Sequence, residues 1–118
     1  MPHRTFPADR DLQRVVNRLF SSAVTPGDVA AKLRRMGIRG ARGECRRCPI
    51  AVVLTRETGR YVEVGFAFAE FYQDKGRPDW GVCLPNAVRE FINAFDNPQD
   101  CPLDLRDLAI DGDVFTSY

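Results

Sequence analysis

Apolar residues recur at the three- and four-residue spacing of an amphipathic helix in two long segments of the chain. The first segment covers about residues 8–20 and carries one apolar stripe: Leu12, Val15, Val16, Leu19 and Phe20. The second opens at Pro85 and carries a similar stripe: Val88, Phe91, Ile92 and Phe95. Both patterns predict helices that bury one face against a common core.

A further helix is predicted over about residues 26–36, where the end signals agree with the spacing. Thr25 offers an N-cap hydroxyl and Pro26 suits the first helical position. Gly37 suits the left-handed residue that follows a helix. Apolar side chains in between recur on one face, at Val29, Leu33 and Met36.

The stretch GECRRCPIAVVL, at residues 43–54, predicts the start of another helix. Pro49 lacks the N–H that a first helical residue leaves unpaired, which places Cys48 at the N-cap. Gly59 then offers a stop. A β-strand is the alternative, because residues 50–55 are rich in β-branched side chains and TRETGR resembles a hairpin turn. The agreement of the two end signals favours the helix.

The segment from about residue 61 to residue 84 changes to an aromatic and β-branched composition typical of strands. YVEVGFAFAEFY is interrupted at Gly65, which indicates a bulge or a turn. QDKGRPD is a turn-rich connection, and WGVCL predicts the partner strand. Strand alternation places Val82 and Leu84, with Trp80, on one face and Cys83 on the other.

These elements predict an α+β fold, with about four helices packed on one face of a small antiparallel β-sheet of two or three strands. A length of 118 residues suits a single domain over 1–118. We place its core at about residues 8–100 and an acidic C-terminal tail at about 101–118.

No apolar run in the chain approaches the ~20 residues that span a bilayer. The first residues, MPHRTFPADRD, also lack the apolar segment of a signal peptide. We therefore expect a cytoplasmic protein with no membrane partner, whose cysteines are thiols or metal ligands rather than structural disulfides.

Charge is distributed unevenly along the chain, although the net charge is only +1. Residues 1–60 hold 13 Lys and Arg against 5 Asp and Glu, whereas residues 61–118 hold 4 against 11. The stretch 34–47 contains six arginines: Arg34, Arg35, Arg39, Arg42, Arg46 and Arg47. Because the guanidinium fork binds two phosphate oxygens at once, this stretch is a candidate site for nucleic acid or another polyanion.

The acidic tail is an alternative partner for the same arginines. It holds apolar anchors at Leu103, Leu105 and Leu108, beside five aspartates: Asp100, Asp104, Asp107, Asp111 and Asp113. Blocks of opposite charge attract within a Debye length of ~8 Å at physiological salt. We therefore predict that the tail docks beside residues 34–47, which would leave polyanion binding weak.

Four cysteines are candidate metal ligands or redox thiols: Cys45, Cys48, Cys83 and Cys101. One C-x-x-C pair supplies half of a four-ligand zinc site, so zinc would need Cys83 and Cys101 to converge on Cys45 and Cys48. We expect no stoichiometric zinc or iron. A helix N-terminus and neighbouring arginines favour a thiolate, so we expect Cys48 or Cys45 to be more reactive than Cys83.

Parts of the chain resemble a group of short actinobacterial proteins. The shared pattern comprises CPIA at 48–51, a helix ending in Thr-Gly, VEV at 62–64 and LPNAVREFINAFD at 84–96, over about residues 25–104. No activity is assigned to that group. The resemblance supports the domain boundaries and singles out Cys48 and Pro49, but it implies no function.

Catalytic signatures are few, and an enzyme is the less favoured prediction. His3 is the only imidazole, and no glycine-rich phosphate loop ends in Lys-Ser or Lys-Thr. We therefore favour a small protein-interaction or regulatory module that binds a protein partner or itself. Its candidate surface is an aromatic segment next to a sheet edge: Phe66, Phe68, Phe71 and Tyr72. Polyanion binding through residues 34–47 and metal or redox chemistry at Cys45 and Cys48 are the alternatives.

Overall fold

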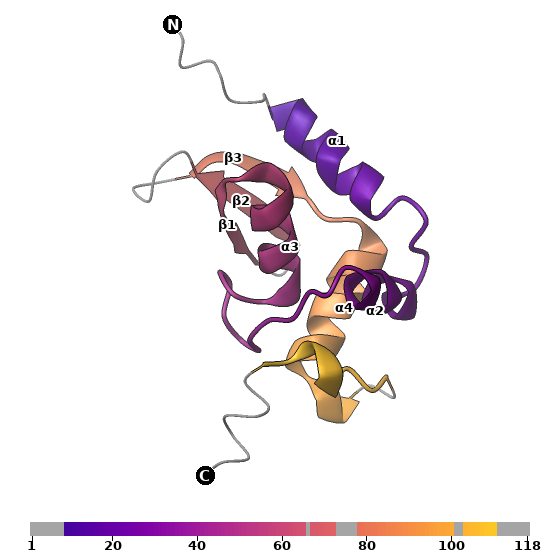
Figure 1. Ribbon diagram of the computed structural model, residues 1–118. Coiled ribbons are helices and arrows are strands. Elements are labelled where there is room, and N and C mark those ends of the chain that lie inside the picture. Colours follow the sequence, from indigo (N-terminus) through magenta and orange to yellow (C-terminus); the bar gives the residue numbers. More distant parts are fainter. Residues whose placement is uncertain (1–8, 66, 73–77, 101–102, 111–118) are drawn as a thin grey trace, which may run out of the picture.

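The computed structural model describes residues 9–65, 67–72, 78–100 and 103–110 of the chain. These residues form four α-helices, a three-stranded sheet and two short 3-10 helices. Figure 1 shows how the helices and strands are arranged. In chain order they are α1 (Asp9–Leu19), α2 (Pro26–Arg35), α3 (Pro49–Thr58), β1 (Tyr61–Val64), β2 (Phe68–Tyr72), β3 (Pro78–Cys83), α4 (Asn86–Asp96), η2 (Pro98–Asp100) and η3 (Arg106–Leu108). The predicted α+β class is confirmed.

Helix α2 begins at the predicted Pro26 and ends at Arg35, one residue before the predicted limit. Its caps satisfy the free backbone groups. The Thr25 side chain accepts a hydrogen bond from the Asp28 N–H at 3.2 Å, and the Asp28 carboxylate accepts one from the Thr25 N–H at 3.0 Å. This reciprocal arrangement is a capping box. Gly37 follows the helix with a φ of +70°, in the left-handed region that favours glycine.

Helix α3 confirms the prediction for the CPIA stretch. Cys48 is the N-cap, and its sulfur accepts a hydrogen bond from the Ala51 N–H at 3.4 Å. Pro49 occupies the first helical position, where its missing N–H costs nothing. Gly59 ends the helix in the left-handed conformation. The alternative strand over residues 50–55 is therefore wrong.

The sheet has the order β1-β2-β3, and both pairs are antiparallel. The interruption at Gly65 is a turn between two strands rather than a bulge, since Gly65 lies after β1 and its N–H bonds to the Phe68 carbonyl at 2.8 Å. Strand alternation gives the sheet one buried face: Val62, Val64, Ala69, Phe71 and Val82. The opposite face, called the open sheet face below, carries Tyr61, Glu63, Phe68, Glu70, Tyr72 and Cys83.

The helices cover the buried face of the sheet. Helix α3 packs on β1 and α1 packs on β3, whereas α2 and α4 pack on each other below the sheet in the view of Figure 1. Helix α4 begins one residue later than predicted, with Pro85 at the N-cap. None of the described helices is long and apolar enough to cross a bilayer.

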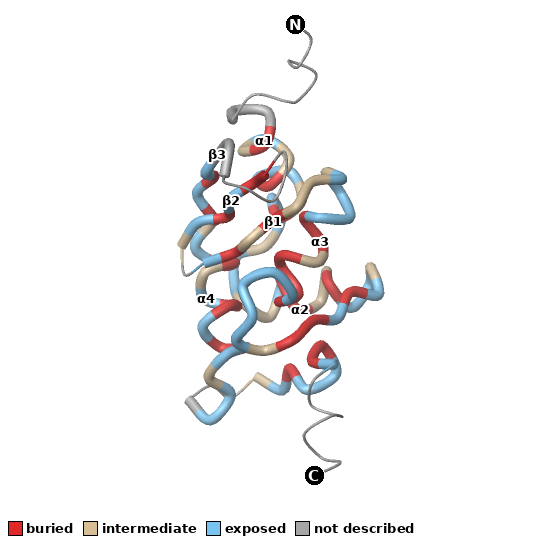
Figure 2. Tube along the Cα trace, turned by 90° about the vertical axis from the view of Figure 1, so that its left-hand side faces the viewer, coloured by how far each residue is buried: buried red, intermediate tan, exposed pale blue. Residues whose placement is uncertain are grey.

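The C-terminal segment contributes to the same core. Leu105, Leu108 and Ala109 are each at most 4% exposed and join the main apolar cluster. Figure 2 shows buried residues on this segment as well as on the helices and strands. The core therefore extends past the predicted limit near residue 100.

Three parts of the chain meet at Gly40. Its N–H bonds to the Leu108 carbonyl at 2.8 Å, and its own carbonyl accepts from the Ile110 N–H at 2.9 Å. On its other side, a β-carbon at residue 40 would lie 2.4 Å from the Arg47 carbonyl oxygen and 2.4 Å from the Pro49 nitrogen. Only glycine fits, because both neighbours are backbone atoms that cannot rotate away.

We predict that Gly40→Ala destabilises the protein by about 3 kcal/mol or more, at or above the upper end of ordinary overpacking costs. The added methyl group must displace the start of α3 or the C-terminal segment. Urea unfolding followed by circular dichroism measures the change.

Gly81→Ala is the matched control, since a β-carbon there meets no atom within 4 Å. Its unfolding free energy should change by less than about 1 kcal/mol, because alanine costs less entropy in a strand than glycine. Equal effects of the two substitutions would contradict the close approach at Gly40.

Candidate functional site

The arginines of the stretch 34–47 are directed to several different partners. Arg34 forms a bidentate pair with the Asp107 carboxylate, at 2.7 and 2.9 Å, and also donates to the Asp104 carbonyl at 2.8 Å. Arg39 donates to the carbonyls of Asp107 at 3.1 Å and Ala109 at 3.3 Å. The guanidinium of Arg34 lowers the pKa of the Asp107 carboxyl.

These contacts confirm the predicted docking of the C-terminal segment beside the arginines. The Asp104 carboxylate pairs instead with Arg106, whose hydrogen bonds lower its pKa to about 2. Leu105 and Leu108 are buried and Leu103 packs against the core. Asp111 and Asp113 lie outside the described residues.

The remaining arginines contact several different groups. The Nε of Arg42 donates to the Phe95 carbonyl at 2.9 Å, and its guanidinium lies 5.1 Å from the centre of the Phe95 ring. Arg46 reaches Glu63 at 3.5 Å and lies over the Tyr61 ring, whereas Arg47 pairs with Glu44 at 3.8 Å. Arg35 is exposed on α2. The six arginines therefore do not converge on one binding surface.

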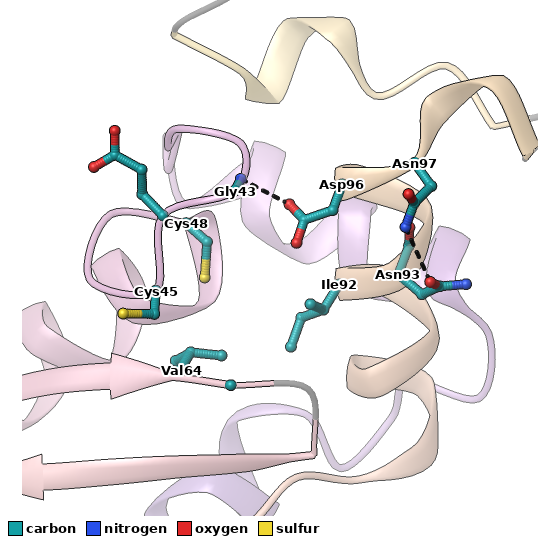
Figure 3. Close-up of a pocket in the computed structure, with 10 residues that line it drawn as sticks. Gly43, Cys45, Cys48, Val64, Ile92, Asn93, Asp96 and Asn97 are labelled. Carbon is teal, nitrogen blue, oxygen red and sulfur yellow. Dashed lines mark hydrogen bonds between the residues drawn. The ribbon is translucent and has the colours of Figure 1, made fainter.

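Cys45 and Cys48 line one cavity between the loop before α3 and helix α4. The cavity has a volume of about 250 Å³ and is also lined by Val64, Ile92 and Asp96. In Figure 3 the Cys48 sulfur is directed into this space, whereas the Cys45 sulfur points away from it. Both are free cysteines, and Cys45 is exposed while Cys48 is buried.

Burial reverses the predicted acidity of Cys48. Desolvation raises the pKa of its thiol from 9.0 to about 11, and it outweighs the hydrogen bonds from the N–H groups of Ala51 and Ile50. The helix N-terminus acts in the predicted direction, but residue Cys48 is only 5% exposed, and burial disfavours the charged form. Burial therefore opposes the thiolate that the helix N-terminus favours at Cys48. The expectation that Cys48 or Cys45 is more reactive than Cys83 stays a prediction.

Cys83 lies far from this pair. The Val64 N–H bonds to the Cys45 carbonyl at 2.7 Å, so Cys45 borders β1, whereas Cys83 ends β3 at the other edge. Two strand spacings of ~4.8 Å separate β1 from β3. No cluster of three or more potential ligands occurs among the described residues, which exclude Cys101. The absence of zinc or iron stays a prediction.

Aromatic and charged side chains contact one another on the part of the open sheet face that lies over β1. The rings of Tyr61 and Tyr72 meet edge to face, with centroids 5.1 Å apart. The Tyr72 hydroxyl donates to Glu63 at 3.1 Å. Burial, and to a smaller extent this hydrogen bond, raise the pKa of the Tyr72 hydroxyl. Arg46 completes the group through its contacts with Glu63 and Tyr61.

The other end of the open sheet face is exposed. Phe68 is 54% exposed and lies directly opposite Cys83, which is also exposed. Glu70 is exposed and lies opposite Glu63. Of the four predicted aromatic residues, Phe71 and Tyr72 are buried and Phe66 lies outside the described residues. The predicted position next to a sheet edge is wrong, because β2 is the central strand. The period of two in FAEFY was the signal that could have separated Phe68 from Phe71.

Both edges of the sheet have partners at the same end. The Gln13 side chain accepts from the Cys83 N–H at 3.1 Å and donates to the Cys83 carbonyl at 2.8 Å. On the opposite edge, the Cys45 carbonyl accepts a hydrogen bond from the Val64 N–H. A partner strand would have to compete with these bonds, so the face offers easier access than the edges.

Comparisons of the chain with protein-family models, with curated proteins and with solved structures found no match. The site must therefore be judged from its own geometry.

We predict that the stability contribution of Cys48 is lost as the pH rises from about 9 to about 11. The unfolded chain releases the thiol proton near 9.0, whereas the folded protein holds it to about 11. The contribution is therefore fully present below pH 9. Its loss amounts to roughly 3 kcal/mol, from two pKa units of about 1.4 kcal/mol each. Urea unfolding across this pH range measures it.

Cys48→Ser removes the titration and keeps an N-cap side chain. Its stability should fall less steeply than that of the wild type over this pH range. Cys45→Ser, at an exposed position, should follow the wild-type slope. Parallel curves for Cys48→Ser and the wild type would contradict the burial argument.

Proposed function

We propose that the protein is a binding module that docks a protein segment carrying basic and apolar side chains on its open sheet face. The observation that carries this proposal is the large exposed fraction of Phe68, 54%, on a face that also presents two glutamates. Exposure of the apolar phenylalanine side chain to water is unfavourable. Aromatic side chains are also enriched at protein interfaces.

Charge on this face favours a basic partner. Glu63 and Glu70 are directly opposite each other on β1 and β2. Like charges in this position destabilise a sheet. Arg46 lies 3.5 Å from Glu63, whereas no ion pair in the described part of the chain includes Glu70. A lysine or arginine of a partner would supply the missing positive charge beside Glu70.

The aromatic groups favour a partner that also brings apolar side chains. Phe68 is the first residue of β2 and lies on the open sheet face. The Tyr61–Tyr72 pair lies at the opposite end of β2, across from the start of β1. The glutamates therefore lie between the exposed Phe68 and the Tyr61–Tyr72 pair, in which Tyr61 is half-buried and Tyr72 is buried. A segment with a basic residue flanked by apolar residues matches this order.

Binding of a polyanion through residues 34–47 is the weaker alternative. The guanidinium groups of three of these arginines already donate hydrogen bonds: those of Arg34 and Arg39 to the C-terminal segment, and that of Arg42 to α4. A phosphate backbone would have to displace these contacts. The C-terminal segment also belongs to the apolar core, so it is not easily released.

A random peptide library displayed on phage tests the proposal directly. Selection on the immobilised protein should enrich peptides with Lys or Arg next to aromatic or aliphatic residues. Their affinity should fall at least ~10-fold for Phe68→Ser, because a central aromatic anchor typically dominates an interface. Glu70→Lys should weaken binding similarly through charge repulsion.

Two matched controls distinguish the open sheet face from general effects of charge and apolar area. Val24→Ser removes another exposed apolar side chain, 80% exposed, and Glu57→Lys changes an exposed glutamate on α3. Both should bind the selected peptides as the wild type does. Enrichment of acidic peptides, failure to enrich any peptide, or equal losses in the controls would overturn the proposal.

A further inference from the structure

We propose that Cys45 and Cys48 form a thiol–disulfide pair, in which Cys45 reacts first with a small disulfide and Cys48 then closes an internal Cys45–Cys48 bond. This inference concerns the cavity beside α4 and does not depend on binding at the open sheet face. It rests on the turn that joins the two cysteines, on their unequal access and on the charges around them.

The loop before α3 makes one helical turn across the pair. The Glu44 carbonyl accepts hydrogen bonds from the N–H groups of Arg47 at 3.1 Å and Cys48 at 2.9 Å. Residues three apart on such a turn have β-carbons about 5–6 Å apart. Disulfides need β-carbons at roughly 3.5–4.5 Å. Rotation of the exposed Cys45 side chain and a small tightening of the turn therefore bring the sulfurs together.

Access decides the order of the two steps. Cys45 is exposed, and besides the cavity with Cys48 it borders a second hollow lined by Arg46, Arg47 and Tyr61. The two arginine side chains remain 59% and 61% exposed despite their ion pairs. Their positive charge attracts anionic disulfides such as oxidised glutathione. Cys48 is buried and cannot meet a bulky reagent directly.

The chemistry requires one small disulfide as the oxidant. The Cys45 thiolate attacks one of its sulfurs, the S–S bond breaks, and one small thiolate leaves with a mixed disulfide on Cys45. Cys48 then loses its proton to solvent and attacks the Cys45 sulfur, which expels the second small thiolate. The protein loses two electrons and two protons, and the small disulfide becomes two thiols.

The second step should be slow at neutral pH. Burial raises the pKa of Cys48, and the Asp96 carboxylate from α4 acts in the same direction. The loop residue Glu44 and the apolar Val64 of β1 also line the cavity. Only a small fraction is thiolate at pH 7. The closing rate should therefore rise about tenfold per pH unit toward pH 10, since the thiolate is the nucleophile.

Closure of the bond would also act on the sheet. The Cys45 carbonyl holds the Val64 N–H at 2.7 Å, and the Cys48 sulfur caps α3. Drawing Cys45 toward Cys48 therefore pulls on the end of β1. The oxidation state of the pair is in this way coupled to the strand that carries Tyr61 and Glu63.

Oxidised glutathione and intact-protein mass spectrometry test the proposal on the full chain. At pH 7 we expect one glutathionyl adduct, mapped by peptide analysis to Cys45. Over time it should convert to a species lighter than the reduced protein by two hydrogens, about 100-fold faster at pH 9 than at pH 7.

Three serine variants assign the roles. Cys48→Ser should retain the adduct at every pH, and Cys83→Ser should behave as the wild type. Cys45→Ser should form no internal disulfide and no adduct that peptide analysis maps to residues 45–48. Circular dichroism checks that each variant folds. If Cys48→Ser does not fold, the pH dependence of closure in the wild type still decides.

Three results would overturn the proposal. The first is faster labelling of Cys83 than of Cys45, and the second is direct labelling of Cys48 in Cys45→Ser. The third is an adduct on Cys45 that does not close at any pH up to about 10.

Discussion

The close approach of two backbone segments at Gly40 is the constraint on which the rest of the structure depends. Residues 38–41 lie against residues 47–49 on one side and bond to residues 108–110 on the other. A side chain at residue 40 would separate the three segments. With glycine there, the loop that leads into α3 closes tightly enough to bury Cys48 and to hold Cys45 beside β1.

The same junction explains the uneven charge of the sequence. Its basic and acidic halves meet where the C-terminal segment crosses residues 34–40, and the Arg34–Asp107 pair lies there. Exposed pairs of this kind contribute only ~0–1 kcal/mol, so the buried Leu105 and Leu108 supply most of the docking energy. The charges orient the C-terminal segment on residues 34–40.

Signals within a few residues of one another were sufficient to predict the secondary structure. Proline, glycine and a capping side chain mark the ends of α2 and α3, and they act through adjacent backbone groups. The features that the sequence did not predict correctly depend on contacts between distant parts of the chain. The acidity of Cys48 follows from burial beneath α4, and the split between exposed Phe68 and buried Phe71 depends on which sheet face the helices cover. Neither distance nor burial can be read from spacing alone.

Hydrogen exchange of the native protein tests the central claim, that the junction at Gly40 is part of the cooperative core. The amides of Gly40, Ala41 and Ile110 donate to Leu108, Arg47 and Gly40 respectively. They should exchange with the same free energy and the same denaturant dependence as the buried amides of α3, because opening any of them requires global unfolding. Exchange of Gly40 and Ile110 by a local opening that is insensitive to denaturant, while α3 stays protected, would contradict the account.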